Sequence, residues 1–473
     1  MNPLRTKWMA LLVSFVLTVP AFPWQPTGTI KRIYVEPFTT KAGAETLRGD
    51  VIGELRKHSS LTIVSAAPEA DAILGGGGEI WIKGYRSLNP RSGRLPSDGT
   101  PFYSGYLSVE LRDRDGETLW SDLVTPKAAS QDVSKDLSKR IAKDVTLALE
   151  RGVGRPETAP LPQPAAVLQG AGATFPYPVY AKWFANFRRA NPAIEIGYQP
   201  IGSEAGIRKL LAGEVDFGAS DNPEAANNQH LLLPSVVGAV VPIVNLPGFP
   251  SDINFTPEAL AGIYLGKIRK WNDPILKEAN HGLRLPDLDI IVVHREEGSG
   301  TSYAWTDYLS KTSPEWKARV GSGFAPRWPA GRAANGNDGV AKLVKELGGS
   351  IGYVEFIYAL RNHLSYGKVR NANGEFVEAS LESLEVAVNN SVKMRDDLKV
   401  SIVNPRGAGA YPIASFTWLV VPVHIADNVK RGAMAAFLKW MLGPGQTQAA
   451  ALGYLALPAD VVRREQTIVA GIQ

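Results

Sequence analysis

The sequence contains no cysteine among its 473 residues. This absence excludes disulfide bonds, zinc sites built from thiolates, thiol catalysis and a lipid-modified amino-terminal cysteine. Histidine is also scarce, and His230, His281 and His294 show no paired spacing of the kind that binds a metal. The chain must therefore hold its fold by packing alone, and we expect no metal.

Long runs of one charge are missing too. The 51 Lys and Arg residues against 46 Asp and Glu give a formal net charge of +5, a small excess for this length. Because the chain shows no lysine or arginine run, zinc-finger pattern or RNA-binding signature, we expect no nucleic-acid partner. The slight cationic bias is typical of a solvated surface, and it would also help to collect a small anion.

One long apolar run occurs, and it lies at the start of the chain. Two cationic side chains precede an apolar stretch from Trp8 to Val19, and Val19 and Ala21 have the spacing of an export cleavage site. The stretch is shorter than the ~20 residues that span a bilayer. We therefore expect residues 1–21 to be a signal peptide and the protein to be exported to the periplasm or cell envelope. A retained membrane anchor is the alternative.

A proline-rich segment divides the chain. Residues 152–167 contain four prolines, which favour an extended, semi-rigid linker. The segment separates a small unit over residues 28–151 from a large unit over residues 168–473. Because a single hydrophobic core rarely grows beyond ~250–300 residues, at least two units are expected from the length alone.

The small unit has the pattern of an α/β domain. Leu47, Val51 and Leu55 recur at a spacing of four and predict a helix, whereas Tyr103–Leu111 alternates as a strand does. Gly75–Gly78 lacks the Lys and Ser or Thr that end a phosphate loop, so we interpret it as a flexible entry to a strand. No chemistry is evident here, and the role of this unit stays unassigned.

The large unit alternates strand and helix patterns throughout. Apolar or alternating runs predict strands at Ile194–Pro200, Val236–Val244, Ile290–Val293, Ile351–Val354 and Trp418–Val423. Such alternation predicts sheets that are covered by helices on both faces.

Three junctions in the large unit place small and hydroxyl residues where a helix is predicted to begin. They are Gly170–Pro176, Gly202–Gly206 and Arg295–Ser302. A helix N-terminus offers free N–H groups and roughly half a positive charge, and glycines let an oxyanion approach them closely. Alternatively, Thr174, Ser203 and Ser299 are ordinary N-caps of their helices.

Asp221 follows a predicted strand that ends in Gly218–Ser220, and open α/β sheets bind ligands at the carboxyl ends of their strands. Enzyme patterns are missing from the same segments. Gly202–Gly206 lacks the Gly-x-Ser-x-Gly spacing of a nucleophile elbow, and Gly170–Gly172 lacks the third glycine of a dinucleotide fingerprint. We therefore expect a binding protein without a cofactor, and not an enzyme.

The stretch from Gly170 to Asp221 closely resembles the phosphate-binding proteins of Pst-type ABC importers. Further likeness lies in Ile263–Trp271 (IYLGKIRKW), Gly298–Ser302 (GSGTS), Gly336–Gly339 (GNDG) and Ile351–Glu355 (IGYVE). The resemblance runs from about residue 168 to about residue 458. It implies a type II periplasmic-binding-protein fold, in which two α/β lobes joined by a hinge enclose phosphate, preceded by the small α/β domain.

The resemblance also implies which residues bind phosphate. The ligand positions of the family carry over to Thr174, Phe175 (through its backbone), Ser203 and Asp221 in the first lobe, and to Arg295, Ser299, Gly300 and Thr301 in the second. Glu297 matches the acidic residue that holds the ligand arginine in place. Two features depart from the family: the small unit itself, and Glu204, which would lie at the rim of the cleft or point to solvent.

These residues imply a mechanism of selectivity. Phosphate at neutral pH still carries a proton, and Asp221 can accept a hydrogen bond from that OH group, whereas sulfate carries no proton. The expected function is the periplasmic substrate-binding component of a high-affinity phosphate ABC importer, a monomer that presents phosphate to a membrane permease. An exported phosphate sensor or scavenger that uses the same site is the alternative.

Overall fold

The computed structural model describes residues 30–40, 46–58, 61–86, 100–114, 118–124, 126, 130–150, 163–225, 227–246, 253–362, 364–391, 397–449 and 452–472. The expected signal peptide and most of the expected linker lie outside these residues. Within the described part of the chain, no helix is both long and apolar enough to cross a membrane.

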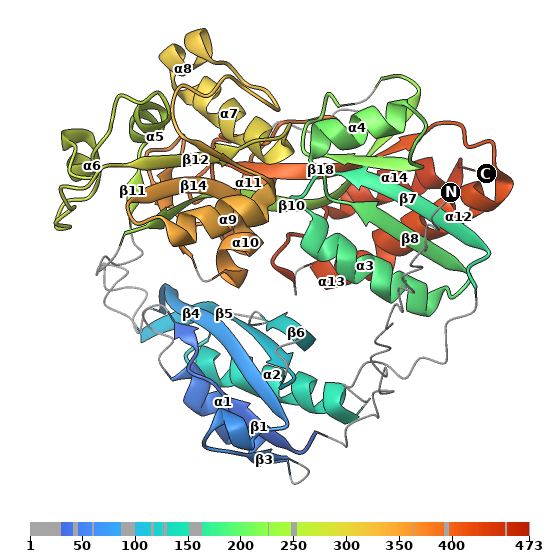
Figure 1. The fold of residues 1–473 in the computed structure, drawn as a ribbon, viewed down its shortest axis with the longest axis horizontal. Coiled ribbons are helices and arrows are strands. Elements are labelled where there is room, and N and C mark those ends of the chain that lie inside the picture. The colour runs from blue at the N-terminus through green and yellow to red at the C-terminus, as the bar shows by residue number, and fades with distance from the viewer. Residues whose placement is uncertain are drawn as a thin grey trace, which may run out of the picture.

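The small unit is built on one sheet with helices against one of its faces (Figure 1). The strands follow the order β3-β1-β4-β5-β6, and β2 pairs with β4. Their bounds are β1 (Arg32–Val35), β2 (Thr39–Thr40), β3 (Thr62–Ile63), β4 (Ala72–Arg86), β5 (Thr100–Arg112) and β6 (Thr118–Val124). Helices α1 (Leu47–Leu55) and α2 (Val133–Glu150) bury their apolar sides against the strands and form a core of their own.

The glycine run of the small unit lies inside β4, and its interpretation as a flexible strand entry was wrong. Residues 75–78 pair in regular antiparallel register with residues 107–110 of β5. A Cβ atom on Gly78 would lie 2.5 Å from Leu47 Cδ1 and 2.9 Å from the Tyr106 carbonyl oxygen. Glycine is therefore used here for the close approach of α1 to the sheet.

The large unit consists of two lobes that share one continuous sheet, with the strand order β13-β12-β14-β10-β18-β9-β7-β8 and with β15 added beside β10. The long strand β10 (His230–Asn245) connects the lobes. Its residues 230–239 pair with β18 (Ala414–Pro422), and its residues 240–245 pair with β14 (Ser350–Glu355). We call the β18 side lobe 1 and the β14 side lobe 2.

Helices lie on both sides of the strands in each lobe (Figure 1). Lobe 1 contains β7 (Ala166–Gly172), β8 (Ile194–Gln199), β9 (Phe217–Ser220), α3 (Tyr177–Ala190), α4 (Ser203–Leu211), α12 (Asn428–Trp440), a π-helical turn (Met441–Gly445), α13 (Gln446–Ala449) and α14 (Ala459–Ala470). The predicted alternation of strands and helices is therefore present.

Lobe 2 contains β12 (Ile291–Arg295), β13 (Arg332–Ala334), β15 (Ser365–Tyr366), α5 (Pro257–Tyr264), α6 (Pro274–Ala279), α7 (Gly300–Thr312), α8 (Pro314–Arg319), α9 (Gly336–Glu346) and α10 (Phe356–Arg361). A small sheet joins β11 (Asn254–Phe255), β16 (Lys368–Arg370) and β17 (Phe376–Val377). Helix α11 (Leu381–Asn389) lies against β10 and β18.

The large unit begins earlier than the sequence indicated. Strand β7 starts at Ala166, within the segment that was expected to be linker up to residue 167. Ala166 and Leu168 are buried, whereas Val167 between them is 39 % exposed. This alternation marks a strand with one buried face, and the neighbouring prolines obscured it in the sequence.

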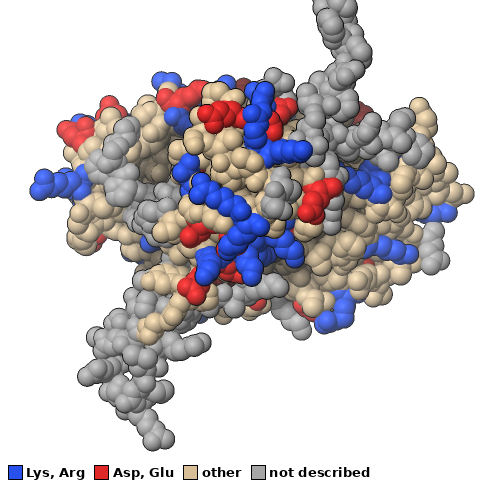
Figure 2. All heavy atoms as spheres, turned by 90° about the horizontal axis from the view of Figure 1, so that it is seen from below, with Lys and Arg blue, Asp and Glu red and all other residues tan. Residues whose placement is uncertain are grey.

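The surface of the small unit carries a basic stripe. Figure 2 shows the molecule from below, with Lys and Arg side chains gathered near the centre of that face. On α2, the exposed residues Lys135, Lys139 and Lys143 recur at a spacing of four, which places them on one side of the helix. The opposite side of α2 is buried against the sheet.

Candidate functional site

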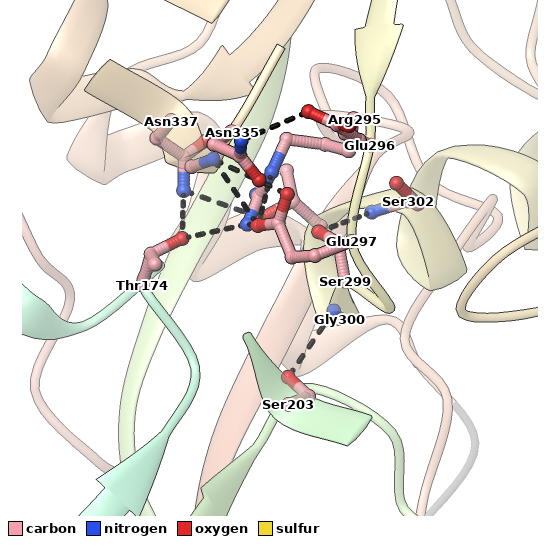
Figure 3. A network of polar contacts seen from close by, with 12 residues as sticks. Thr174, Ser203, Arg295, Glu296, Glu297, Ser299, Gly300, Ser302, Asn335 and Asn337 are labelled. Atoms are coloured by element: carbon pink, nitrogen blue, oxygen red, sulfur yellow. Dashed lines mark hydrogen bonds and ion pairs between the residues drawn. The ribbon is translucent and has the colours of Figure 1, made fainter. Parts of the chain in front are cut away.

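The predicted ligand residues come together where lobe 1 meets lobe 2. Figure 3 shows Thr174, Ser203, Arg295, Ser299 and Gly300 at this place. Each follows the carboxyl end of a strand or opens a helix: Thr174 and Phe175 after β7, Ser203 in the first turn of α4, Asp221 after β9, Arg295 at the end of β12, and Ser299, Gly300 and Thr301 at the start of α7. The seven non-glycine side chains are at most 8 % exposed. The structure therefore shows the two lobes closed over the site.

Arg295 is the cation of this cluster, and its side chain is 1 % exposed. Its Nε donates to Glu297 Oε1 at 2.8 Å, and its Nη2 bonds the same oxygen. Glu297 also accepts from the Gly336 backbone N–H at 3.2 Å. One edge of the guanidinium is thus held by a charged partner, as expected, and its other N–H groups are directed toward both lobes.

The hydroxyl of Thr174 lies opposite this guanidinium. Its Oγ1 accepts from Arg295 Nη2 at 3.1 Å and from Asn337 Nδ2 at 2.9 Å. Helix α3 has Pro176 as its N-cap and no side-chain capping bond. The alternative that Thr174 is an ordinary N-cap was therefore wrong, because its hydroxyl makes contacts between the lobes instead.

Ser203 also lacks a capping role, whereas Ser299 has one. Helix α4 has Gly202 as its N-cap without a side-chain bond, and the Ser203 hydroxyl accepts from the Gly300 backbone N–H of the other lobe at 3.1 Å. Ser299 Oγ accepts from the Ser302 N–H at 3.2 Å and caps α7. The capping alternative thus holds for one of the three hydroxyls.

Asp221 is a carboxyl group buried to 1 % exposure. Its Oδ1 accepts from the Thr417 hydroxyl, and its Oδ2 is a buried oxygen without a hydrogen-bond partner in the described part of the chain. A Cβ atom on Gly300 would lie 2.3 Å from this Oδ2 and 2.5 Å from Ser203 Oγ. Glycine at 300 therefore brings the start of α7 against the free oxygen of Asp221.

Burial raises the pKa of Asp221 to about 7, against the lowering effects of the Thr417 hydrogen bond and the Arg295 charge. A buried, unpaired carboxyl oxygen is costly, so such an atom calls for an explanation. Here it lies beside hydroxyls, a helix N-terminus and a guanidinium. These donors can hold the unprotonated oxygens of a tetrahedral oxyanion, while Asp221 Oδ2 accepts a hydrogen bond from the OH group of the anion.

Two contacts hold Phe175 in place, one at its backbone carbonyl and one at its ring. Its carbonyl accepts from the Tyr454 hydroxyl at 2.7 Å, and its ring is fully buried. A Cβ atom on Gly238 of β10 would lie 2.5 Å from that ring. The ring therefore anchors the loop after β7 to the strand that connects the lobes.

Asn337 is part of this network, although the sequence did not indicate it. Its Nδ2 donates to Thr174 Oγ1 and, at 3.4 Å, to Thr301 Oγ1, while its Oδ1 accepts from the Glu355 N–H at 2.9 Å. The GNDG segment was part of the family resemblance, and that was the one signal available. Thr417, the partner of Asp221, lies on β18 and carried no signal at all.

Glu204 was expected to lie at the rim of the cleft or to point to solvent, and the structure shows elements of both. Its backbone N–H donates to the Gly298 carbonyl of lobe 2 at 3.2 Å. Its carboxylate is 43 % exposed and lies 3.3 Å from Arg208 Nη1 of the next helical turn. The residue therefore contributes to the contact between the lobes while its charge remains partly in solvent. The described residues contain no cluster of acidic or histidine side chains that would hold a metal ion.

Residues 158–444 match a family model described as a PBP superfamily domain. The phosphate-binding protein PstS of Pasteurella multocida is 41 % identical over 308 residues, which cover 64 % of this chain and 89 % of that protein. PstS of Xylella fastidiosa is 43 % identical over 303 residues, which cover 63 % and 83 %. A solved human phosphate binding apolipoprotein, 20 % identical, covers 63 % of this chain and 93 % of its own with a TM-score of 0.52, a likeness in fold alone.

Proposed function

The chain belongs to the PBP superfamily and, within it, to the PstS phosphate-binding proteins, and from that membership we propose a function. It is the exported component that captures inorganic phosphate for an ABC importer. The two-lobed type II fold expected from the sequence is confirmed for the large unit. The relatives are binding proteins, and we propose no catalytic activity for this chain.

The observation that carries this proposal is the placement of Asp221 and Arg295 around one point between the lobes. The guanidinium supplies a fixed positive charge, and the start of α7 supplies N–H donors. Asp221 Oδ2 has no protein partner among the described residues. An anion that carries one proton can accept from Arg295 and donate to Asp221 Oδ2. A fully ionised anion would instead place one of its acceptor oxygens against the acceptor oxygen of Asp221.

Capture involves movement of the lobes about β10. This strand pairs with β18 in lobe 1 and with β14 in lobe 2, so bending near its residues 239–240 would separate the two sets of ligands. Closure removes water from the site and strengthens its electrostatic interactions. We propose that the closed form is presented to the membrane permease in the periplasm, and that release follows when the lobes part.

Calorimetry of the protein without residues 1–21 against phosphate and sulfate tests the proposal. Phosphate is expected to bind with a Kd near or below ~1 μM, which corresponds to about −8 kcal/mol. Sulfate at millimolar concentration is expected not to compete. Equal binding of the two anions would contradict the role given to Asp221, and no binding of phosphate would contradict the function.

A further inference from the structure

Two buried tyrosine hydroxyls bond consecutive carbonyl groups of the loop that follows β7. Tyr358 donates to the Thr174 carbonyl at 2.6 Å, and Tyr454 donates to the Phe175 carbonyl at 2.7 Å. Their side chains are 3 % and 0 % exposed. Burial raises the pKa of both well above the usual value for tyrosine, so each hydroxyl keeps its proton and remains a donor.

The Tyr358 bond acts on the peptide that joins Thr174 to Phe175. A trans peptide is planar, and its carbonyl oxygen and its N–H point in opposite directions. A hydroxyl that fixes the Thr174 oxygen therefore also fixes the direction of the Phe175 N–H, the proposed backbone ligand. The Phe175 carbonyl held by Tyr454 belongs to the next peptide, which has no N–H because residue 176 is proline.

The two tyrosines differ in the lobe from which they come. Tyr454 belongs to lobe 1 with the loop itself, since the adjacent Leu455 pairs with Val237 in the lobe 1 part of β10. Tyr358 lies on α10 of lobe 2, which packs against β14 and α9. The Tyr358 bond to Thr174 therefore spans the cleft and exists only while the lobes are closed.

Water can replace this bond when the lobes separate. Tyr358 lines a hollow of about 440 Å³ between α3 of lobe 1 and α10 of lobe 2, together with the charged residues Lys182, Asp338 and Arg361. Opening the cleft at this side would hydrate both the hydroxyl and the Thr174 carbonyl. The bond then contributes to the closed form and adds little to the stability of the open protein.

We propose that Tyr358 is a positioning residue that couples lobe closure to phosphate retention. On closure its hydroxyl fixes the Thr174–Phe175 peptide, so that the Phe175 N–H is directed at the bound anion and the closed complex lives longer. This inference rests on the proposed function, because it concerns the same site. It assigns a role to a residue that lies outside the set of ligands.

Tyr358→Phe in the full chain tests the inference, with Tyr308→Phe as a matched control. Tyr308 is also fully buried, and its hydroxyl donates to the Arg370 carbonyl at 3.2 Å entirely inside lobe 2. Tyr358→Phe is expected to raise the Kd for phosphate about five- to tenfold, through a faster dissociation rate at an unchanged association rate. Its melting temperature without phosphate should equal that of the wild type.

Tyr308→Phe is expected to show the opposite pattern, a lower melting temperature at an unchanged Kd. Stopped-flow tryptophan fluorescence measures the two rates, and calorimetry measures the Kd. Wild-type binding rates in Tyr358→Phe would overturn the inference, and so would an affinity loss that comes with a lower melting temperature of the phosphate-free protein. A wild-type protein that fails to bind phosphate would instead overturn the proposed function, a distinguishable result.

Discussion

Asp221 carries the selectivity of the site because one of its oxygens is paired and the other is free. The Thr417 hydroxyl fixes Oδ1, so the carboxyl group cannot rotate without losing a buried bond. Burial raises its pKa in the folded protein from 3.8 to about 7. The group is consequently neutral below about pH 7 in the closed form and ionised above it, so its hydrogen-bonding capacity changes within the physiological range.

We expect exclusion of sulfate to weaken as the pH falls. From about pH 8 to about pH 6 the Asp221 carboxyl gains a proton and becomes able to donate to a sulfate oxygen. Competition of sulfate with phosphate, measured by calorimetry over this range, should therefore increase toward acid. Asp221→Asn supplies a donor at every pH, so its sulfate competition should be stronger and should depend less on pH than that of the wild type. Competition that does not change with pH in the wild type would contradict this account.

Arg295 is expected to provide the largest single contribution to phosphate affinity. Arg295→Ala should cost roughly 2–5 kcal/mol of binding free energy, because only neutral donors would then remain to bind the buried anion. Arg208→Ala is the matched control, since that side chain is 68 % exposed and pairs with Glu204 at the rim. It should change the affinity little. Wild-type affinity in a folded Arg295→Ala protein, measured by calorimetry, would show that the site lies elsewhere.

At the scale of helices and strands, the sequence predicted the positions of the elements well. It predicted less well the role of the residues at the start of each helix. The junctions at Thr174, Ser203 and Ser299 have a similar local pattern, a hydroxyl within two residues of a glycine near the start of a helix. One hydroxyl caps its helix, and the other two bond the opposite lobe. Local sequence cannot separate these cases, because the deciding partners, such as Asn337 and Gly300, come from distant parts of the chain.

Strand ends were missed for a related reason. β18 begins at Ala414, before the apolar run from Trp418 that predicted it. Its first residues, such as Ser415 and Thr417, are small or polar, yet they are buried between Asp221 and the paired strand β10. A buried polar residue can be assigned to a strand only once its hydrogen-bond partner is known, and the sequence alone does not give that partner.

Helix α14 contains a buried acid that lies outside the set of proposed phosphate ligands. Val461, Glu465 and Val469 form its buried side, and both carboxyl oxygens of Glu465 lack a hydrogen-bond partner among the described residues. Burial raises the pKa of Glu465 well above its ordinary value. A raised pKa in the folded state means that stability is full at acid pH and is lost as the pH rises through the folded pKa.

We therefore expect Glu465→Leu to stabilise the protein at neutral pH by about 1–3 kcal/mol, since it removes an unpaired buried group of similar size. The gain should shrink toward about pH 5, where the wild-type carboxyl is neutral in the folded protein. Thermal melts at both pH values measure this. Glu214→Leu, on the surface at 57 % exposure, is the control and should show no such gain. A destabilised Glu465→Leu protein would contradict the account.

At the scale of the whole molecule, the two units form separate hydrophobic cores but interact with each other. Tyr106 of β5 packs against the core of the large unit. Lys182 of α3 has a pKa lowered mainly by burial, and the negative charge of Asp122 on β6 opposes that effect. Tyr106 and Asp122 lie on strands of the small unit, β5 and β6. The sequence held no sign of these interactions between the units.

The large unit is nevertheless expected to bind phosphate alone. None of the proposed ligands precedes Thr174, and a fragment that starts at Pro164 keeps the whole of β7 from Ala166. Its Kd for phosphate should lie within about threefold of that of the full chain, a difference below ~1 kcal/mol. Titration of both proteins by calorimetry measures this, with the small unit over residues 28–151 as the fragment that should not bind. If the large fragment aggregates or binds much more weakly, the contact through Tyr106 belongs to the binding mechanism. Tyr106→Ser in the full chain would then have to reproduce the loss.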